Sequence, residues 1–275
     1  MKTIIGLDKL RTSRLSLAGT VGLVPTMGYL HEGHLSLIRL AKAECDNVVV
    51  SIFVNPTQFG ANEDLSKYPR DLERDLSLIE PLGVDLVWTP TAEIMYPTGY
   101  QTWVEVDAIT RPLEGLMRPT HFKGVTTVVA KLFNAVQPHK AYFGQKDAQQ
   151  AAVIRQMVRD LNFPIDVIVC PIVREADGLA MSSRNTNLKG TARQDALAIS
   201  RYLAAVRGRF AAGERDAATL LADAAQALLP GRVDYASLVD ADDLQPVLAV
   251  ERPALVAVAA FFGGVRLIDN TVLRP

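Results

Sequence analysis

The stretch VGLVPTMGYLHEGH, residues 21–34, decides the fold class of this chain. Val21–Pro25 is short and apolar, as a buried strand is, and a helical pattern follows from about His34 to Cys45. The next run, Val48–Val54, is continuously apolar, which is typical of a strand covered on both faces of a parallel sheet. A strand, a helix and a second buried strand in this order predict an α/β fold.

The same alternation continues to about residue 173. The pattern predicts a helix marked by Leu72, Leu76 and Ile79, which closes near Gly83, and a strand over Val84–Trp88. An edge or excursion strand is expected over Thr102–Val106, followed by a helix with an apolar stripe from Val125 to Val136. The last elements are a strand over Lys140–Gly144, a helix over Asp147–Leu161 and a strand over Ile165–Val173. Together these elements predict a Rossmann-like parallel sheet domain over residues 1–173.

The character of the sequence changes after residue 173, where the polar segment SSRNTN interrupts the alternation. Thr191-x-x-Gln194 is a capping-box pattern that opens an alanine-rich helix, and a second helix is expected to end before Pro230. Strands are predicted over Val233–Val239, Leu255–Phe262 and Val265–Ile268. We therefore expect a smaller α+β domain over residues 174–275.

Composition and charge exclude several classes of protein. The 275 residues include 29 Lys+Arg and 30 Asp+Glu, so the net charge is −1 and the strong basic field of a general nucleic-acid binder is absent. The longest uncharged apolar stretch, Pro253–Val265, has 13 residues and is too short to span a membrane. The N-terminal residues lack the apolar region of a signal peptide, which favours a cytoplasmic location. Cys45 and Cys170 show no zinc-site spacing.

Residues 27–34 carry the first chemical signal, because they follow a strand at the place where open α/β sheets bind ligands. Gly28 and Gly33 let the backbone approach a ligand, and the free N–H groups of a helix start favour a phosphate. His31 and His34 lie three residues apart, so both rings can face one phosphate. Two alternatives stay open: the histidines cap and pack the helix, or they bind zinc.

Two further segments follow predicted strands and carry polar side chains. Asn55 and Gln58, in NPTQFG, are amides that can orient a polar substrate without charge. In FGQKDAQQ, Lys146 can neutralise a phosphate, Asp147 can cap the helix or hold a ribose hydroxyl, and Gln150 lies on the first helical turn. The alternatives are an ordinary Asn-Pro turn and a surface Lys–Asp pair.

Two more signals complete the candidate site. Met181-Ser182-Ser183-Arg184 places two hydroxyls and a guanidinium on a loop, which suits a triphosphate because Arg matches phosphate oxygens bidentately. A polar linker is the alternative interpretation of that segment. Asp75, seven residues after Tyr68, can hold Mg²⁺ through one carboxylate and waters, although such a residue is more often a solvated helix charge.

With these segments in order, the sequence resembles the pantothenate synthetase family, the ATP-dependent pantoate:β-alanine ligases. The resemblance covers nearly the whole chain through PTMGYLHEGH, FVNPTQFG, YPRDLERD, RPTHFKGVTTVV, FGQKDAQQ, VREADGLAMSSRN and RLIDN. The HxGH pattern alone would indicate only the wider superfamily of nucleotidyltransferases and class I aminoacyl-tRNA synthetases. The resemblance implies a homodimer of subunits with a Rossmann-type domain and a small C-terminal lid.

The resemblance also implies two chemical steps. The pantoate carboxylate attacks the α-phosphorus of ATP to give pantoyl adenylate and pyrophosphate, and the β-alanine amine then attacks the acyl carbon and releases AMP and pantothenate. The motifs imply His34, His31 and Lys146 as catalytic residues, with His34 as the family's assigned acid. We expect His34 to act mainly electrostatically, because a carboxylate is already a nucleophile at about pH 7.

The resemblance further assigns ligands to the motifs. Pantoate is expected at Gln58 and Gln150, with Asn55 and Tyr68 as neighbours, and Asp75 is the expected Mg²⁺-side carboxylate. Gln58 is also expected to meet β-alanine. The residues implied for ATP are Met27, Gly28, Tyr29, Leu30, His31, Glu32, Gly33, His34, Gly144, Gln145, Lys146, Asp147, Val173, Met181, Ser182, Ser183 and Arg184.

Two positions depart from the family's pattern, and two other functions compete. Gln145 stands where many relatives have Glu, and Arg74 stands where the family often has a second acid. A related enzyme that transfers a nucleotidyl group to a phosphate would leave Gln58 and Gln150 without a task. A nucleotide sensor without turnover is disfavoured by the intact HxGH, Lys146 and Arg184. The predicted strand over Thr102–Val106, if it is an edge, is a candidate for the dimer contact.

Overall fold

The computed structural model describes residues 1–60, 63 and 65–275, which form two compact units. The first unit contains Met1–Gly144 and Val153–Pro171, and the second contains Gln145–Ala152 and Ile172–Pro275. The second unit thus includes residues 145–152, whereas the sequence pattern predicts them in the first domain. Helix α7 (Ala148–Asp160) contributes residues to both units.

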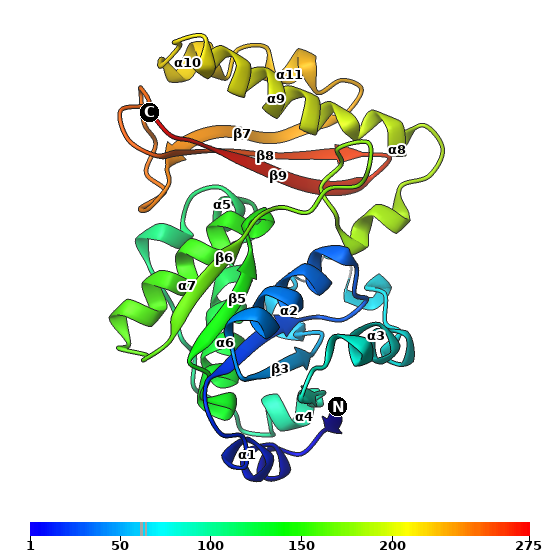
Figure 1. Cartoon of the computed structure of the whole chain (residues 1–275). Coiled ribbons are helices and arrows are strands. Elements are labelled where there is room, and N and C mark those ends of the chain that lie inside the picture. The colour runs from blue at the N-terminus through cyan, green and yellow to red at the C-terminus, as the bar shows by residue number, and fades with distance from the viewer. Residues whose placement is uncertain (61–62, 64) are drawn as a thin grey trace. The chain divides into compact units, whose positions relative to one another are not determined.

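A six-stranded parallel sheet forms the centre of the first unit (Figure 1). Its strands are β1 (Lys2–Ile4), β2 (Val21–Thr26), β3 (Asn47–Ile52), β4 (Leu86–Trp88), β5 (Lys140–Gly144) and β6 (Asp166–Cys170). The strands are ordered β1-β4-β3-β2-β5-β6, and every neighbouring pair is parallel. The chain proceeds from β2 to β3 and β4 on one side and later adds β5 and β6 on the other, so the order reverses between β2 and β5. Open α/β sheets bind ligands at such a reversal.

Helices cover both faces of this sheet. They are α1 (Leu7–Leu15), α2 (Glu32–Glu44), α3 (Leu72–Ile79), α4 (Ala92–Met95), α5 (Glu114–Met117), α6 (His121–Val136) and α7, with short 3₁₀-helices η1 (Pro56–Gln58), η2 (Leu65–Lys67), η3 (Glu80–Leu82) and η4 (Ala108–Thr110). Leu23 of β2 packs in one apolar cluster with Phe133 of α6, whereas Val24 packs in another with Ile38 of α2 and Ile79 of α3. Successive side chains of a strand point to opposite faces, so α6 covers one face and α2 with α3 the other.

The second unit is built on a three-stranded antiparallel sheet. Its elements are η5 (Gln145–Asp147), η6 (Ser183–Asn187), α8 (Ala192–Asp195), α9 (Leu197–Ala211), α10 (Ala217–Leu220), α11 (Ala224–Ala227), β7 (Arg232–Asp240), β8 (Ala254–Phe262) and β9 (Val265–Leu273), with strand order β7-β8-β9. Helices α9 to α11 lie along one face of this sheet (Figure 1), where Ile199, Leu203 and Val206 of α9 join the core. The predicted combination of a parallel α/β sheet and a smaller α+β part is confirmed.

Some local predictions were wrong. Thr102–Val106 is not a strand, because Val104 instead bonds to α6: its N–H donates to Thr127 Oγ1 (3.0 Å) and its carbonyl accepts from Thr126 Oγ1 (2.7 Å). The Thr191 side chain makes no capping hydrogen bond, and the predicted alanine-rich helix begins as the separate short α8. Strand β1 and helix α1 were not predicted, since both are mostly exposed and lack an apolar pattern.

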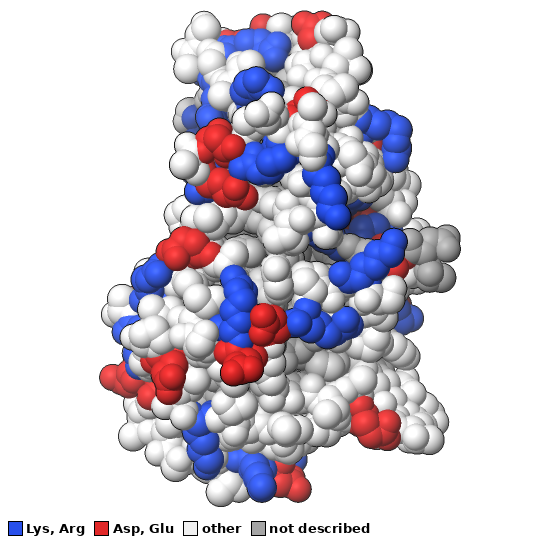
Figure 2. Space-filling view, turned by 90° about the vertical axis from the view of Figure 1, so that its right-hand side faces the viewer, with Lys and Arg blue, Asp and Glu red and all other residues white. Residues whose placement is uncertain are grey.

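Surface charge agrees with the near-zero net charge of the sequence. Acidic and basic side chains are interspersed on the face that Figure 2 presents. Within the described part of the chain, no helix has both the length and the apolar character that crossing a bilayer requires.

Candidate active site

The loop that follows β2 turns sharply at Gly28. Gly28 has a φ of 82° and Tyr29 a φ of 50°, both in the left-handed region that glycine adopts without strain. A Cβ atom at Gly28 would lie 3.1 Å from Oδ2 of Asp75 and 3.2 Å from Cγ2 of Ile52. Glycine therefore allows the main chain of this loop to lie against Asp75.

Asp75 of α3 holds the same loop through two hydrogen bonds. Its Oδ2 accepts from the Tyr29 N–H and its Oδ1 from the Leu30 N–H, both at 2.7 Å. The Arg74 Nη1 donates to the Leu30 carbonyl at 3.0 Å and lies 3.5 Å from Asp75 Oδ1. The Asp75 residue is 1% exposed, and this burial raises the pKa of its carboxyl, an effect that the two N–H donors and Arg74 oppose. Both carboxylate oxygens are thus engaged by the loop and by Arg74.

His31 and His34 lie side by side at the start of α2. His31 is the N-cap residue, and its N–H donates to His34 Nδ1 at 3.3 Å. The two ring centroids are 4.1 Å apart, and both residues are half-buried. Because Nδ1 of His34 accepts a hydrogen bond, a neutral His34 ring carries its proton on Nε2. The site therefore presents an imidazole N–H donor next to the N–H groups of a helix start, which suits a phosphate.

A second polar group follows β3, the strand next to β2. Asn55 Nδ2 donates both to Gln58 Oε1 and to the Gly124 carbonyl, each at 3.1 Å. Its Oδ1 accepts from the Tyr96 hydroxyl at 2.8 Å and from Thr57 Oγ1 at 2.9 Å. A Cβ atom at Gly124 would lie 2.4 Å from the Thr57 carbonyl oxygen, so helix α6 can approach this turn only with glycine there. Asn55 and Gln58 are brought together as an ordered amide pair.

The residues that lead into α6 contact the main chain of Gln58. His121 Nδ1 donates a hydrogen bond to the Gln58 carbonyl oxygen at 2.9 Å, and Arg118 Nη2 lies 3.4 Å from the same oxygen. Arg118 also forms a bidentate ion pair with Glu63 through Nε and Nη2, at 2.7 Å each. Burial, with a smaller contribution from the Arg118 charge, lowers the pKa of His121 to about 4. His121 is therefore neutral near pH 7.

The second unit holds the predicted lysine segment in place through Asn270 of β9. Asn270 Nδ2 donates to the carbonyls of Gln145 and Lys146 at 2.9 Å each, and Gln145 Nε2 donates to Asn270 Oδ1 at 3.1 Å. The Lys146 Nζ lies 3.7 Å from Asp147 Oδ1, and Gln150 follows on the first turn of α7. The neutral amide of Gln145 thus has a local partner in Asn270.

The serine-rich segment belongs to the same unit. The Met181 N–H donates to the Val173 carbonyl at 3.0 Å, which joins two of the predicted nucleotide residues. Ser182 is the N-cap of η6, where its Oγ accepts from the Arg184 N–H at 3.2 Å. Met181, Ser182, Ser183 and Arg184 are all partly exposed.

The predicted site residues divide between the two units. The first unit contains Met27–His34, Asn55, Gln58, Tyr68, Asp75 and Gly144, and the second contains Gln145, Lys146, Asp147, Gln150, Val173 and Met181–Arg184. Tyr68 is buried and packs edge-on against Phe59 next to the NPTQ turn. The Leu30 side chain is fully buried in the core, so only its main chain belongs to the loop surface.

Sequence reasoning did not identify the residues that support these groups. Arg118 and His121 lie in RPTHFKG, and Asp269 and Asn270 lie in RLIDN, two motifs to which no chemistry was assigned. Asp269 accepts a bidentate ion pair from Arg174 at 2.6 and 3.0 Å. The available signal was a set of polar residues inside otherwise apolar segments, and His121, Asp269 and Asn270 are indeed buried.

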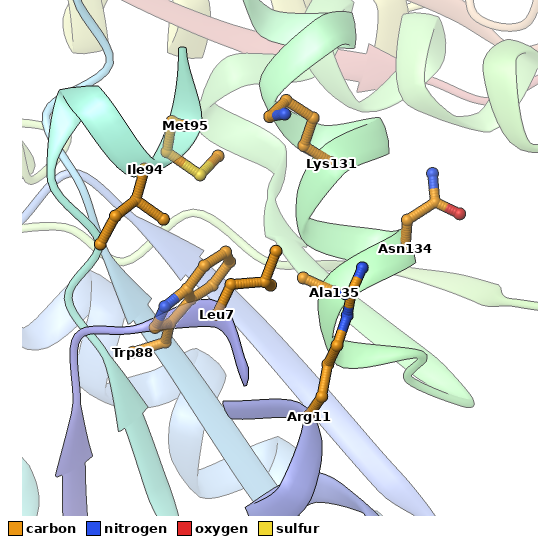
Figure 3. A pocket seen from close by; sticks show the side chains of 8 residues that line it. All are labelled: Leu7, Arg11, Trp88, Ile94, Met95, Lys131, Asn134 and Ala135. Carbon is orange, nitrogen blue, oxygen red and sulfur yellow. The ribbon is translucent and has the colours of Figure 1, made fainter. Parts of the chain in front are cut away.

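A separate cavity of about 200 Å³ lies in the first unit (Figure 3). Trp88 of β4 and Met95 of α4 line it, and Arg11 of α1 and Lys131 of α6 border it. Burial lowers the pKa of Lys131, whose Nζ lies 4.8 Å from the centroid of the Tyr100 ring. The lining includes none of the predicted site residues.

The fold and the loop after β2 define the class of protein. A parallel sheet with a glycine turn and an HxGH helix start at the reversal of strand order is a nucleotide-binding α/β protein of Rossmann-like architecture. The family model described as pantoate-beta-alanine ligase matches residues 1–272. The chain belongs to that family.

Relatives and solved structures agree with this assignment. A pantothenate synthetase from Roseiflexus sp. (strain RS-1) is 56% identical over 278 residues and covers 100% of both chains. One from Acidobacterium capsulatum is 59% identical over 257 residues, 92% of this chain and 86% of its own. The crystal structure of pantothenate synthetase from Thermus thermophilus has a TM-score of 0.95 at 47% identity, with 100% of both chains covered.

A further solved structure holds ligands. It is pantoate-beta-alanine ligase from Francisella tularensis, complexed with beta-gamma ATP and beta-alanine. It is 35% identical to this chain with a TM-score of 0.81, over 99% of this chain and 97% of its own.

Proposed function

We propose that this chain is the ligase that condenses pantoate with β-alanine at the expense of ATP. In the first step a pantoate carboxylate oxygen attacks the α-phosphorus of ATP, and the bond to pyrophosphate breaks. In the second step the β-alanine amine attacks the acyl carbon of pantoyl adenylate, loses a proton, and AMP leaves. Adenylation supplies the leaving group that amide formation needs.

One observation carries this proposal beyond nucleotide binding. The phosphate-binding loop after β2 and the ordered amide pair Asn55–Gln58 after β3 follow adjacent parallel strands, which pair from Val21 to Thr26. The Gln58 Oε1 accepts from Asn55, and its Nε2 has no hydrogen-bond partner among residues 1–60, 63 and 65–275, so this group can donate to an oxygen of a ligand. Transfer of a nucleotidyl group to a phosphate has no evident need for such an amide, whereas pantoate offers hydroxyl and carboxylate oxygens.

The family's residue roles come to this chain as part of the same proposal. His34 donates its Nε2 proton in a hydrogen bond to a phosphate oxygen and stabilises the charge that develops there, with His31 as a second phosphate partner. Lys146, Ser182, Ser183 and Arg184 bind phosphate oxygens. The remaining predicted ATP residues surround the nucleotide, and Gln150, together with Asn55 and Tyr68, completes the pantoate site.

Mg²⁺ enters this proposal with the substrate, as MgATP. Asp75 is 1% exposed and each of its oxygens faces a main-chain N–H group, of Tyr29 and of Leu30, so the carboxylate is turned toward the loop and away from solvent. Mg²⁺ commonly binds through substrate phosphates. We therefore assign Asp75 to the loop and not to the metal.

Product analysis tests the function directly. The pure protein is incubated with ATP, Mg²⁺ and pantoate, with and without β-alanine, and AMP, ADP and pantothenate are measured. AMP and pantothenate formed in equal amounts, only with both substrates and without ADP, are the expected result. ATP left intact would favour a nucleotide sensor, and nucleotidyl transfer to an added phosphate acceptor would favour the transferase alternative.

The predicted homodimer and the cytoplasmic location belong to the same proposal. Val104 bonds to α6, but the peptide groups of Trp103 and Glu105 have no hydrogen-bond partner among the described residues. Trp103 is 44% exposed. An extended segment whose alternate peptide groups are free can pair with the same segment of a second copy, antiparallel about Val104.

Sedimentation velocity tests this dimer contact. Glu105→Pro removes one of the free N–H donors and should shift the protein toward the monomer. Glu105→Gln keeps the N–H donor and removes only the negative charge that faces Lys123, so it should remain a dimer. A dimer that survives Glu105→Pro unchanged would place the contact elsewhere.

A further inference from the structure

The motif RPTHFKG, residues 118–124, has no task in the proposed chemistry, yet it surrounds the turn that carries Gln58. His121 donates to the Gln58 carbonyl at 2.9 Å, and Arg118 approaches the same oxygen at 3.4 Å. His121 is 8% exposed. Burying the polar His121 ring costs desolvation energy unless its N–H finds an acceptor. That acceptor is the carbonyl of Gln58, a residue predicted to bind substrate.

The other end of Gln58 is attached to the same helix. Asn55 links the Gln58 Oε1 to the Gly124 carbonyl of α6, at 3.1 Å on each side. The first turn of α6 thus fixes the main chain of Gln58 through His121 and its side chain through Asn55. With both ends held, the Nε2 of Gln58 has one direction in which to donate.

The Arg118 guanidinium supports this arrangement without leaving an unbalanced charge. It is paired bidentately with Glu63, and its Nη1 lies 3.6 Å from Glu114 Oε2. Arg118 is therefore committed to carboxylates of this chain and is not available as a carboxylate receptor for a substrate. Its contribution is to fix the residues before α6 so that His121 meets the Gln58 carbonyl.

We infer that His121, supported by Arg118, is a positioning residue for the acyl substrate, acting through Gln58. This inference rests on the proposed function, because Gln58 must meet pantoate for its direction to matter. His121 does not contact substrate itself. It sets the direction of the Gln58 amide, and so the KM for pantoate, while the ATP site after β2 is held separately by Asp75.

Two variants of His121 separate a positioning role from a general effect on folding. His121→Leu removes the donor, whereas His121→Asn keeps a side-chain N–H at about the place of Nδ1. His121→Leu should raise the KM for pantoate about tenfold, the effect of one lost hydrogen bond, and leave the KM for ATP within about twofold. His121→Asn should restore the KM for pantoate to within about threefold of the unchanged protein.

Several outcomes would overturn the inference. These are an unchanged KM for pantoate in His121→Leu, a parallel rise in KM for all substrates, or a His121→Asn variant as impaired as His121→Leu. If His121→Leu does not fold, Arg118→Lys takes its place, since it keeps the charge but loses the bidentate pair with Glu63, and a selective rise in the pantoate KM is again expected.

Hydrogen exchange of the amides of residues 57–60 keeps this test independent of the proposed function. If the unchanged protein forms no pantothenate, the proposed function fails, but the positioning contact is still measurable. His121→Leu should speed exchange of the Thr57, Gln58 and Phe59 amides at least tenfold, and His121→Asn should not. Equal exchange in both variants would contradict a positioning role for His121.

Discussion

At the scale of single residues, Asp75 shows how one buried carboxylate can fix the conformation of the loop after β2. Its two oxygens accept the N–H groups of Tyr29 and Leu30, 46 and 45 residues away in sequence. Hydrogen bonds to a charged group contribute more than neutral ones, and an unsatisfied buried donor is costly. Asp75 therefore keeps Gly28 and Tyr29 in their left-handed conformations, which place the start of α2.

The substitution Asp75→Asn tests this role. The amide can accept from one loop N–H, but its NH₂ group opposes the other, so we expect the free energy of unfolding to fall by about 2–3 kcal/mol and the KM for ATP to rise. Asp71→Asn is the matched control on the same helix, because Asn caps a helix as well as Asp and should change stability by less than about 0.5 kcal/mol. Urea unfolding of both variants measures the difference, and equal stabilities would contradict the assignment.

The orientation of the His34 ring gives a second residue-scale prediction. His34→Ala removes the Nε2 donor and should lower pantoyl-adenylate formation by about 10²–10³-fold while the melting temperature changes little. His34→Gln places an amide N–H near the position of Nε2 and should retain part of the activity. Pantoate-dependent exchange between pyrophosphate and ATP isolates this step. Unchanged exchange in His34→Ala would exclude the catalytic role.

Sequence reasoning identified the polar residues at the strand ends but not the residues that hold them in place. His31, His34, Asn55 and Gln58 follow strand ends, and chemistry at strand ends can be read locally. The partner of Asp75 is defined only by the fold, so sequence spacing indicated a solvated charge or a Mg²⁺ ligand. His121 was missed for the same reason, because its acceptor is a main-chain carbonyl 63 residues away.

At the scale of elements, the contact between α6 and the NPTQ turn depends on Gly124. Replacing a glycine inside a helix by alanine normally stabilises it by about 0.5–1 kcal/mol. At Gly124 the added Cβ would lie 2.4 Å from the Thr57 carbonyl, so the turn would have to move away from the helix. At this position the change from glycine to alanine should therefore lower the stability of the protein instead of raising it.

Gly124→Ala should lower the free energy of unfolding by about 1–3 kcal/mol and abolish most pantothenate formation. Gly208→Ala in α9 is the matched control, since a Cβ there meets nothing within 4 Å. The control should gain about 0.5–1 kcal/mol. Thermal unfolding of the two variants checks the prediction, which would be wrong if both glycines responded with the same sign.

Helices and strands could be predicted where apolar residues recur at the spacing of a helix or form the continuous run of a buried strand. The apolar stripe from Val125 to Val136 predicted α6, and the continuous apolar run that begins at Val48 predicted β3. Apolar and polar residues alternate in Thr102–Val106 as they do in a strand. Such a segment becomes a strand only when a neighbouring strand is present to pair with it. In this chain Thr126 and Thr127 of α6 take the place of that partner.

At the scale of the whole molecule, tertiary contacts decide where one compact unit ends. The sequence places residues 145–152 in the first domain, because they follow β5 directly. In the structure they group with the second unit, where Asn270 of β9 bonds to the carbonyls of Gln145 and Lys146. Asn270 and Gln145 are 125 residues apart in the sequence, so the residues near Gln145 do not indicate this contact.

His121 also makes global stability depend on pH. Burial first, and the Arg118 charge second, lower its pKa from 6.5 to about 4, while the hydrogen bond to the Gln58 carbonyl and then the charges of Glu114 and Glu63 oppose the shift. Between these values the unfolded chain takes up a proton that the folded chain does not. The stabilising contribution is therefore complete above about pH 6.5 and is lost as the pH falls toward 4, by about 3 kcal/mol.

Urea unfolding at pH 7, 5.5 and 4.5 measures this loss, and His121→Asn, which cannot titrate, isolates the share that belongs to the imidazole. The unchanged protein should lose more stability than the variant on acidification. Asp75 acts in the opposite direction, because burial raises its pKa and the folded chain takes up its proton first. An equal loss in both proteins would mean that His121 is protonated in the folded state well above pH 4, and that burial does not keep the ring neutral next to Gln58.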